Sequence, residues 1–146
     1  MAKVITNGTE ADDVLISGAD SNGYAVFGFA GSDYIVGSPS DDELDGGDGL
    51  DGVSYADATA NITVDLATGT ASGDGIGNDT LTSIEAVDGG SGSDTLTAND
   101  SGSILYGMGG HDVLIGGLGA DALYGGTGND DLRGGGDDIG NTLYGN

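Results

Sequence analysis

A nine-residue repeat constrains this sequence more than any other feature. From Gly89 to Arg133 five nonapeptides follow one another without a gap, reading GGSGSDTLT, ANDSGSILY, GMGGHDVLI, GGLGADALY and GGTGNDDLR. The eighth position is always leucine, and the sixth is aspartate except in the second unit, which has Ser103. A block in the same frame, GFAGSDYIV, GSPSDDELD and GGDGLDGVS, covers residues 28–54. This pattern predicts that one repeat architecture accounts for the whole chain.

The repeats resemble the calcium-binding nonapeptide of the repeats-in-toxin (RTX) family, G-G-x-G-x-D-x-(large apolar)-x. Full matches are residues 46–54, 89–97, 116–124 and 125–133, with looser units at 8–16, 28–45, 74–82 and 107–115. The resemblance implies a protein that leaves a Gram-negative bacterium unfolded by type I secretion and folds outside the cell. In the family a C-terminal secretion signal usually follows the repeats, whereas this chain ends within the pattern.

The residue types of the repeat predict a turn followed by a short strand. Glycine adopts positive φ angles at little cost, so the first six positions favour a tight turn. In the last three positions the leucine points inward and its two neighbours point outward. Two nonapeptides then form one coil of a flattened solenoid, and turns on one edge stack about 4.8 Å apart. The predicted fold is all-β, a parallel β-roll with calcium ions between stacked Gly/Asp turns.

The charge of the chain predicts that cations complete the fold. The formal net charge is −23, and Lys3 and Arg133 are the only strong cations. Packed carboxylates would repel one another strongly without counterions. Disorder is the alternative for such a composition, but large apolar residues recur at fixed offsets from aspartate. Nucleic acid and anionic membranes would repel the chain and are not expected partners.

Several classes of protein lack support in the sequence. There is no cysteine, which excludes disulfides and cysteine zinc sites. No stretch approaches the roughly 20 apolar residues of a spanning helix, and residues 1–10 lack the apolar core of a signal peptide. The motifs H-E-x-x-H and G-x-S-x-G are absent. The single histidine, His111, is expected to be an exposed filler rather than a ligand or base, so an enzyme is not predicted.

Turns that lie 18 residues apart predict calcium sites between them. Ca²⁺ takes six to eight hard oxygen ligands, which two aspartate carboxylates and the carbonyl groups of glycine turns can supply. Asp94, Asp112 and Asp130 have this spacing and predict two consecutive slots with two carboxylates each. Asp33 and Asp51 repeat the arrangement in the first block. A simple turn is the alternative for one such loop, but the regular spacing of the acids favours ligands.

The opposite edge is predicted to be poorer in ligands. Asp121 faces Ser103 on one side, so that slot lacks a carboxylate. On its other side the neighbour of Asp121 is expected to be Asp137, Asp138 or Asn141, after a two-residue insertion.

The same two-residue offset is expected in the first block, where Asp13 would pair with Asp33, and Asp42 with Asn22 or Asp20. The complete set of candidate calcium ligands is Asp13, Asp33, Asp42, Asp51, Asp79, Asp94, Asp112, Asp121, Asp130, Asp138, Gly47, Gly49, Gly90, Gly92, Gly109, Gly117, Gly119, Gly126 and Gly128.

We expect residues 1–146 to form one domain. It comprises a repeat block at 8–54, a strand-containing interruption at 55–88 and a second block at 89–146. Tyr106, Tyr124 and Tyr144 share an outward position and predict a cross-strand ladder, which is also a candidate contact surface. A threonine array of the kind that binds ice would need to be longer than the one present.

The predicted function is that of a secreted or cell-surface calcium-binding structural protein that folds on meeting calcium outside the cell. Neither end carries an evident cap over its last strand, so head-to-tail self-association into fibres or matrix is expected. The alternative is a non-catalytic calcium-binding and secretion module of a larger secreted enzyme or adhesin. The start MAKV and the repeats at both ends favour the independent protein.

Overall fold

The computed structural model describes residues 3–18, 22–136 and 140–145, which form two β-sheets and no helix. The nine-stranded sheet has the order β1 (Val4–Asn7), β3 (Tyr24–Phe27), β5 (Glu43–Asp45), β9 (Gly77–Thr82), β8 (Thr70–Gly73), β7 (Ile62–Asp65), β11 (Thr95–Thr97), β13 (Val113–Ile115) and β16 (Asp131–Arg133). The eight-stranded sheet has the order β17 (Thr142–Tyr144), β14 (Ala122–Tyr124), β12 (Ile104–Gly110), β10 (Ala86–Gly90), β6 (Gly52–Ser54), β4 (Tyr34–Val36) and β2 (Val14–Ile16), with β15 (Thr127–Gly128) beside β12. No helix long and apolar enough to cross a membrane is found in the described ranges.

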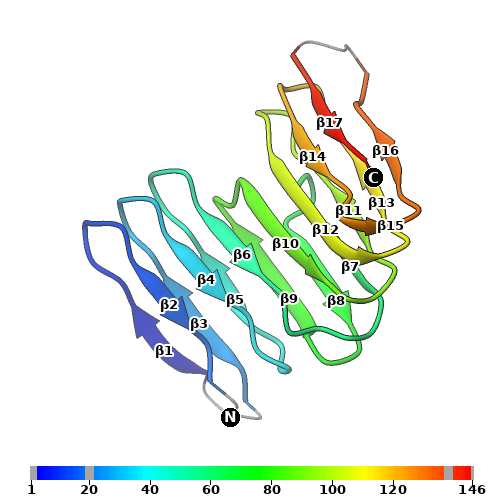
Figure 1. The fold of residues 1–146 in the computed structure, drawn as a ribbon. Helices are drawn as coiled ribbons and strands as arrows, with labels where there is room; N and C mark the ends of the chain where they lie inside the picture. Colours follow the sequence, from blue (N-terminus) through cyan, green and yellow to red (C-terminus); the bar gives the residue numbers. More distant parts are fainter. Residues whose placement is uncertain (1–2, 19–21, 137–139, 146) are drawn as a thin grey trace.

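The predicted parallel β-roll is confirmed. In the repeat blocks successive strands alternate between the two sheets and pair in parallel with the strand one coil away (Figure 1). Leu96 faces Leu114, and Leu105 faces Leu123, which is the 18-residue step expected from two nonapeptides per coil. These four leucines have no exposed surface. Burial of each contributes about 1.5–3 kcal/mol, so the eighth position of the repeat forms the core.

The interruption inserts an antiparallel meander into only one sheet. Strand β8 pairs antiparallel with both β7 and β9, while β9 also pairs with β5 and β7 with β11. In the eight-stranded sheet β6 pairs directly with β10. This coil therefore has three strands in the nine-stranded sheet, two more than a repeat coil, and no extra strand in the other sheet. In Figure 1, β8 and β9 lie between the two repeat blocks.

The meander decides which turns share an edge of the roll. We call edge 1 the turns that lead into the eight-stranded sheet, and edge 2 the turns that lead into the nine-stranded sheet. Asp33 and Asp51 precede β4 and β6 and so lie on edge 1, whereas Asp94 precedes β11 and lies on edge 2. The Ser103 and Asp121 turns, which precede β12 and β14, are on edge 1. Edge 1 is therefore poorer in carboxylates only within the second block.

Candidate metal centre

The aspartates at the sixth repeat position form a hydrogen-bonded ladder along each edge. One carboxylate oxygen, Oδ1, accepts the backbone N–H of the sixth residue one coil earlier. The Asp94 N–H donates to Asp112 at 2.8 Å, and the Asp112 N–H donates to Asp130 at 3.0 Å. On edge 1 the Asp33 N–H donates to Asp51 at 2.7 Å. Each bond links consecutive turns, so the carboxylates are stacked in one column.

The second oxygen, Oδ2, has no hydrogen-bond partner among the described residues in five of these aspartates. All five Oδ2 atoms are buried, and they belong to Asp33, Asp51, Asp94, Asp112 and Asp130. Burial raises the pKa of Asp51 and Asp94, and it raises the pKa of Asp112 to about 6. A buried carboxylate oxygen without a partner is costly, so these sites need a cation or a proton.

The unpartnered oxygen lies over the glycine at the first position of the same repeat. A Cβ added to Gly89 would lie 2.9 Å from Asp94 Oδ2, 3.0 Å from the carbonyl oxygen of Gly107 and 3.2 Å from that of Tyr106. A carboxylate and carbonyl groups from the next coil thus converge on a space that only glycine leaves open. An all-oxygen donor set of this kind suits Ca²⁺.

Carbonyl groups are required in these sites because side chains alone are too few. No group of three or more His, Cys, Asp or Glu side chains placed to hold a metal ion is found in residues 3–18, 22–136 and 140–145. The aspartates would therefore hold calcium together with backbone oxygens of the stacked turns. The donor set and the space over the first glycine fit this ion.

Comparison with known sequences agrees with this geometry. The RTX calcium-binding nonapeptide repeat, in a four-copy form, matches residues 27–55, 88–123 and 106–138, which cover more than half of the chain. The chain belongs to the RTX repeat family. A search of curated proteins found no match to this RTX chain.

Three RTX turns satisfy their carboxylate within the protein. The Oδ2 atoms of Asp13, Asp42 and Asp121 accept the N–H of the second residue in their own repeats at 2.6, 2.9 and 2.9 Å. Their Oδ2 atoms are therefore less in need of a cation than the five described above. The sequence could not separate the two groups, because all of these aspartates occupy the same repeat position.

Asp79 is a special case within the interruption. Its Oδ1 continues the ladder by accepting the Asp42 N–H at 2.8 Å, and its Oδ2 accepts the hydroxyl of Tyr55 at 2.7 Å. Burial raises the pKa of Asp79 to about 7, and it raises the pKa of the Tyr55 hydroxyl well above its usual value. The Tyr55 hydroxyl therefore bonds the Oδ2 atom that has no partner in five other aspartates of the ladder.

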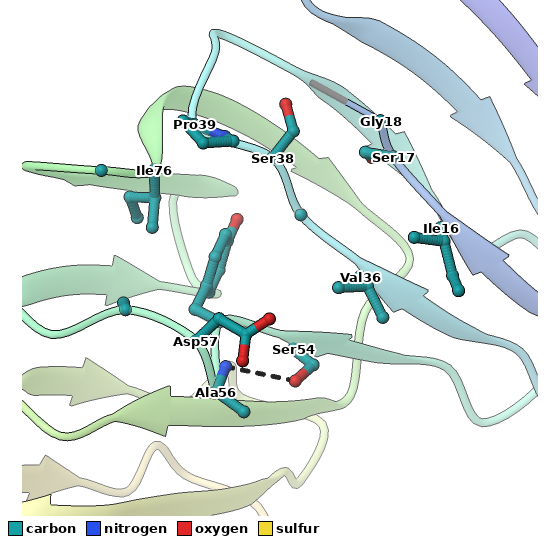
Figure 2. Close-up of a pocket in the computed structure, with 14 residues that line it drawn as sticks. Ile16, Ser17, Gly18, Val36, Ser38, Pro39, Ser54, Ala56, Asp57 and Ile76 are labelled. Carbon is teal, nitrogen blue, oxygen red and sulfur yellow. Dashed lines mark hydrogen bonds between the residues drawn. The ribbon is translucent and has the colours of Figure 1, made fainter. Parts of the chain in front are cut away.

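A cavity of about 520 Å³ lies beside Tyr55, between the loops that follow β2, β4 and β6 and the turn before β9 (Figure 2). Its wall combines apolar side chains such as Ile76 with the hydroxyls of Ser38 and Ser54. Among the described residues that line it, Asp57 carries the one carboxylate. The Ser54 hydroxyl accepts the Ala56 N–H at 3.3 Å.

The strand register corrects one expected neighbour of Asp42, and a hydrogen bond identifies Asn141 among the expected neighbours of Asp121. The residue opposite Asp42 is Tyr24, whose N–H donates to Asp42 Oδ1 at 2.7 Å, so the expected offset to Asn22 is wrong. Asp20, the other candidate, lies outside the described residues. At the other end the Asp121 N–H donates to Asn141 Oδ1 at 2.8 Å, while the candidates Asp137 and Asp138 lie outside the described residues.

The ladder contains the expected two-residue offset between Asp13 and Asp33 and the expected pairing of Asp121 with Ser103. The Asp13 N–H donates to Asp33 Oδ1 at 2.8 Å, and the Ser103 N–H donates to Asp121 Oδ1 at 2.8 Å. The second bond places a serine where the slot would need another carboxylate. This is the arrangement predicted for Ser103.

Glu85 is a ladder residue that the sequence analysis missed. Its Oε2 accepts the Asp51 N–H at 3.0 Å. The turn between β9 and β10 spans only residues 83–85, and a glutamate is used there in place of the sixth-position aspartate. The sequence carried a signal for this role, since Glu85 is followed by the apolar pattern of a repeat strand.

The candidate glycines fall into two classes. The φ angle is positive at Gly47, Gly49, Gly126 and Gly128. The expectation of positive φ is wrong for the other candidates, Gly90, Gly92, Gly109, Gly117 and Gly119. A Cβ at Gly90 would lie 2.5 Å from the carbonyl oxygen of Ala58, so the close approach of the neighbouring coil requires glycine there. In repeat 107–115 the fourth residue is Gly110, and its φ is positive. The candidate Gly109 is the third residue of that repeat.

The fifth repeat position forms a second ladder in the opposite direction. Here each side chain accepts the N–H of the fifth residue one coil later. Asn61 accepts from Ser93 at 2.9 Å, Ser93 accepts from His111 at 3.2 Å, and His111 Nδ1 accepts from Asn129 at 2.9 Å. His111 is exposed as expected, but it also links two turns.

Proposed function

We propose that this chain is a secreted, non-catalytic structural protein that folds when calcium binds outside the cell. The observation that carries the proposal is the set of five buried Oδ2 atoms without a partner, at Asp33, Asp51, Asp94, Asp112 and Asp130. With calcium they become ligands, and without it they face burial and mutual repulsion within a chain of net charge −23. Calcium binding and folding are then one reaction.

The proposed sites lie on both edges of the roll. Asp33 and Asp51 serve edge 1 of the first block, and Asp94, Asp112 and Asp130 serve edge 2 of the second block. In each site the carboxylate is joined by carbonyl groups of the stacked turns. The remaining sixth-position aspartates, including Asp138, are proposed as weaker ligands.

Membership of the RTX family supports a route of export from a Gram-negative bacterium. A chain that folds only with calcium would stay unfolded at the low calcium concentration of the cytosol. It would then fold in the millimolar calcium outside the cell. Release into the medium or retention at the cell surface are both compatible with this order of events.

Circular dichroism with and without calcium tests the proposal. We expect a largely unfolded chain in chelator and a β-rich chain at about 10 mM Ca²⁺, well above the range of extracellular calcium modules. Magnesium is the control, because it is smaller and loses its water reluctantly. A spectrum that does not change between chelator and calcium would overturn the proposal.

We further propose that calcium-loaded copies associate head to tail. Among the described strands, β1, β2, β16 and β17 each pair on one side only. Apolar side chains are exposed on these strands, with Ile5 at 68%, Val14 at 69% and Tyr144 at 54%. Parallel addition of a second copy would pair these edges and, because the contact is heterologous, extend into a fibre.

Sedimentation and electron microscopy of this polypeptide test the association. We expect filaments in calcium that chelator disperses, because neutralised carboxylates no longer repel the next copy. Monomers at every protein concentration in calcium would refute assembly and leave the calcium proposal intact.

A further inference from the structure

The outer face of the eight-stranded sheet carries a stack of tyrosine rings. Tyr106 and Tyr124 have ring centroids 4.7 Å apart with planes inclined by 14°, and Tyr124 and Tyr144 have the same separation with an inclination of 7°. The stack has one end at Tyr106, because the next strand, β10, places Asp88 opposite it. The second ring face of Tyr106 is therefore directed toward a carboxylate.

Asp88 is held in place by another tyrosine. The hydroxyl of Tyr34 donates to Asp88 Oδ2 at 2.6 Å. No hydrogen bond to the other oxygen, Oδ1, is found among the described residues. A fixed carboxylate with one available oxygen beside an aromatic face is a preorganised site for a positive charge.

A pocket of about 300 Å³ is lined by Asp88, Tyr106, Met108, Tyr124 and Gly126. Met108 takes the second repeat position, which is glycine in the full repeats, and its φ is 70°. This left-handed conformation is unfavourable for methionine, and its side chain is 44% exposed. Phe29 has the same repeat position and a φ of 80°, so the turn imposes this conformation and Met108 presents an exposed apolar side chain at the pocket.

The lining selects one kind of ligand. Aromatic rings and a thioether favour an apolar, polarisable group, and the single carboxylate favours a positive charge. One carboxylate is too small a ligand set for a metal ion such as Ca²⁺, and its charge would repel an anion. We propose that this pocket binds an alkylated ammonium group of the trimethylammonium type, carried either by a soluble molecule or by a lipid head group.

Titration calorimetry of the calcium-loaded protein with choline tests the proposal. We expect a dissociation constant on the order of 1 mM, as fits a partly exposed cation–π site with one ion pair. The neutral isostere 3,3-dimethylbutan-1-ol should bind at least about tenfold more weakly. Equal binding of the two compounds, or no choline binding, would overturn the proposal.

Variants separate this pocket from the general negative charge of the chain. Asp88→Asn and Tyr106→Leu should each weaken choline binding about fivefold or more. The control Asp65→Asn removes a carboxylate from the nine-stranded sheet and should leave choline binding unchanged. Weakening by Asp65→Asn equal to that by Asp88→Asn would indicate nonspecific attraction and refute the site.

Met108→Gly distinguishes a binding role from a structural one. Glycine relieves the left-handed strain, so thermal stability in calcium should be kept or rise while choline affinity falls. Unchanged affinity in this variant would exclude Met108 from the site and count against the proposal. Sedimentation with phosphatidylcholine and phosphatidylglycerol vesicles then identifies the source: binding to phosphatidylcholine assigns a lipid head group, and choline binding without vesicle binding assigns a soluble ligand.

Discussion

The Tyr55 hydroxyl donates a 2.7 Å hydrogen bond to Asp79 Oδ2, the oxygen that has no partner in five other aspartates of the ladder. Tyr55 is 3% exposed and follows β6, where the chain leaves the first repeat block. The interruption therefore supplies a hydroxyl donor to Asp79 Oδ2, whereas the Oδ2 atoms of those five aspartates have no donor among the described residues. On the proposed function, we therefore expect Asp79 to need calcium less than these five aspartates.

Tyr55→Phe should destabilise the calcium-loaded protein by about 1–3 kcal/mol, because it leaves a buried carboxylate oxygen without a partner. Urea unfolding in saturating calcium measures the loss. Tyr144→Phe removes an exposed hydroxyl and is the control, with an expected change near zero. The number of calcium ions bound, measured by equilibrium dialysis, should stay the same in both variants; gain of an ion in Tyr55→Phe would show that the Tyr55 hydroxyl keeps calcium away from Asp79 Oδ2.

Asp112→Ala should lower calcium affinity more than Asp121→Ala. Asp112 joins two carboxylate turns through the ladder and has a buried Oδ2 without a partner, whereas Asp121 faces Ser103 and its Oδ2 accepts an N–H from its own repeat. Calorimetric titration of both variants measures the difference, and Asp57→Ala, at an exposed loop position, is the control. Equal losses for Asp112→Ala and Asp121→Ala would argue against the proposed division of sites.

The calcium-free chain should be more structured at pH 5 than at pH 8. Burial raises the pKa of Asp112 to about 6 and that of Asp79 to about 7, so the folded state binds protons more tightly than the unfolded state. The stabilisation by these protons is present at low pH and is lost as the pH rises through 6 to 7. Circular dichroism in chelator at both pH values measures the effect.

Calcium should reverse this pH dependence, because protons and calcium compete for the same carboxylates. Calcium affinity is expected to fall as the pH is lowered from 8 to 5. A calcium-free spectrum that shows more structure at pH 8 than at pH 5 would contradict the assigned pKa shifts.

His111→Ala should destabilise the fold by about 0.5–1.5 kcal/mol, the net contribution of one hydrogen bond. The imidazole Nδ1 accepts the Asn129 N–H, and alanine has no acceptor to replace it. Asn occupies the equivalent position at Asn61, so His111→Asn should keep most of the stability. Thermal unfolding in calcium compares the variants; equal destabilisation by Ala and Asn would show that the fifth-position ladder contributes little.

The local repeat determined much of this protein. The inward leucines, the 18-residue coil and the stacking of Asp94 with Asp112 all follow from residue types at fixed spacing, because strand alternation and turn geometry act over a few residues. For the same reason the carboxylate deficit at Ser103 could be predicted before the strands were placed.

The tertiary structure alone decided which carboxylates lack a partner and which turns share an edge. Asp79 and Asp112 occupy equivalent repeat positions, but only Asp79 meets a hydroxyl, which comes from Tyr55 and is 24 residues away in the sequence. The meander of β7, β8 and β9 likewise places Asp51 and Asp94 on opposite edges. These outcomes depend on long-range strand pairing, which is set by the packing of the whole roll and carries no signal within a single nonapeptide.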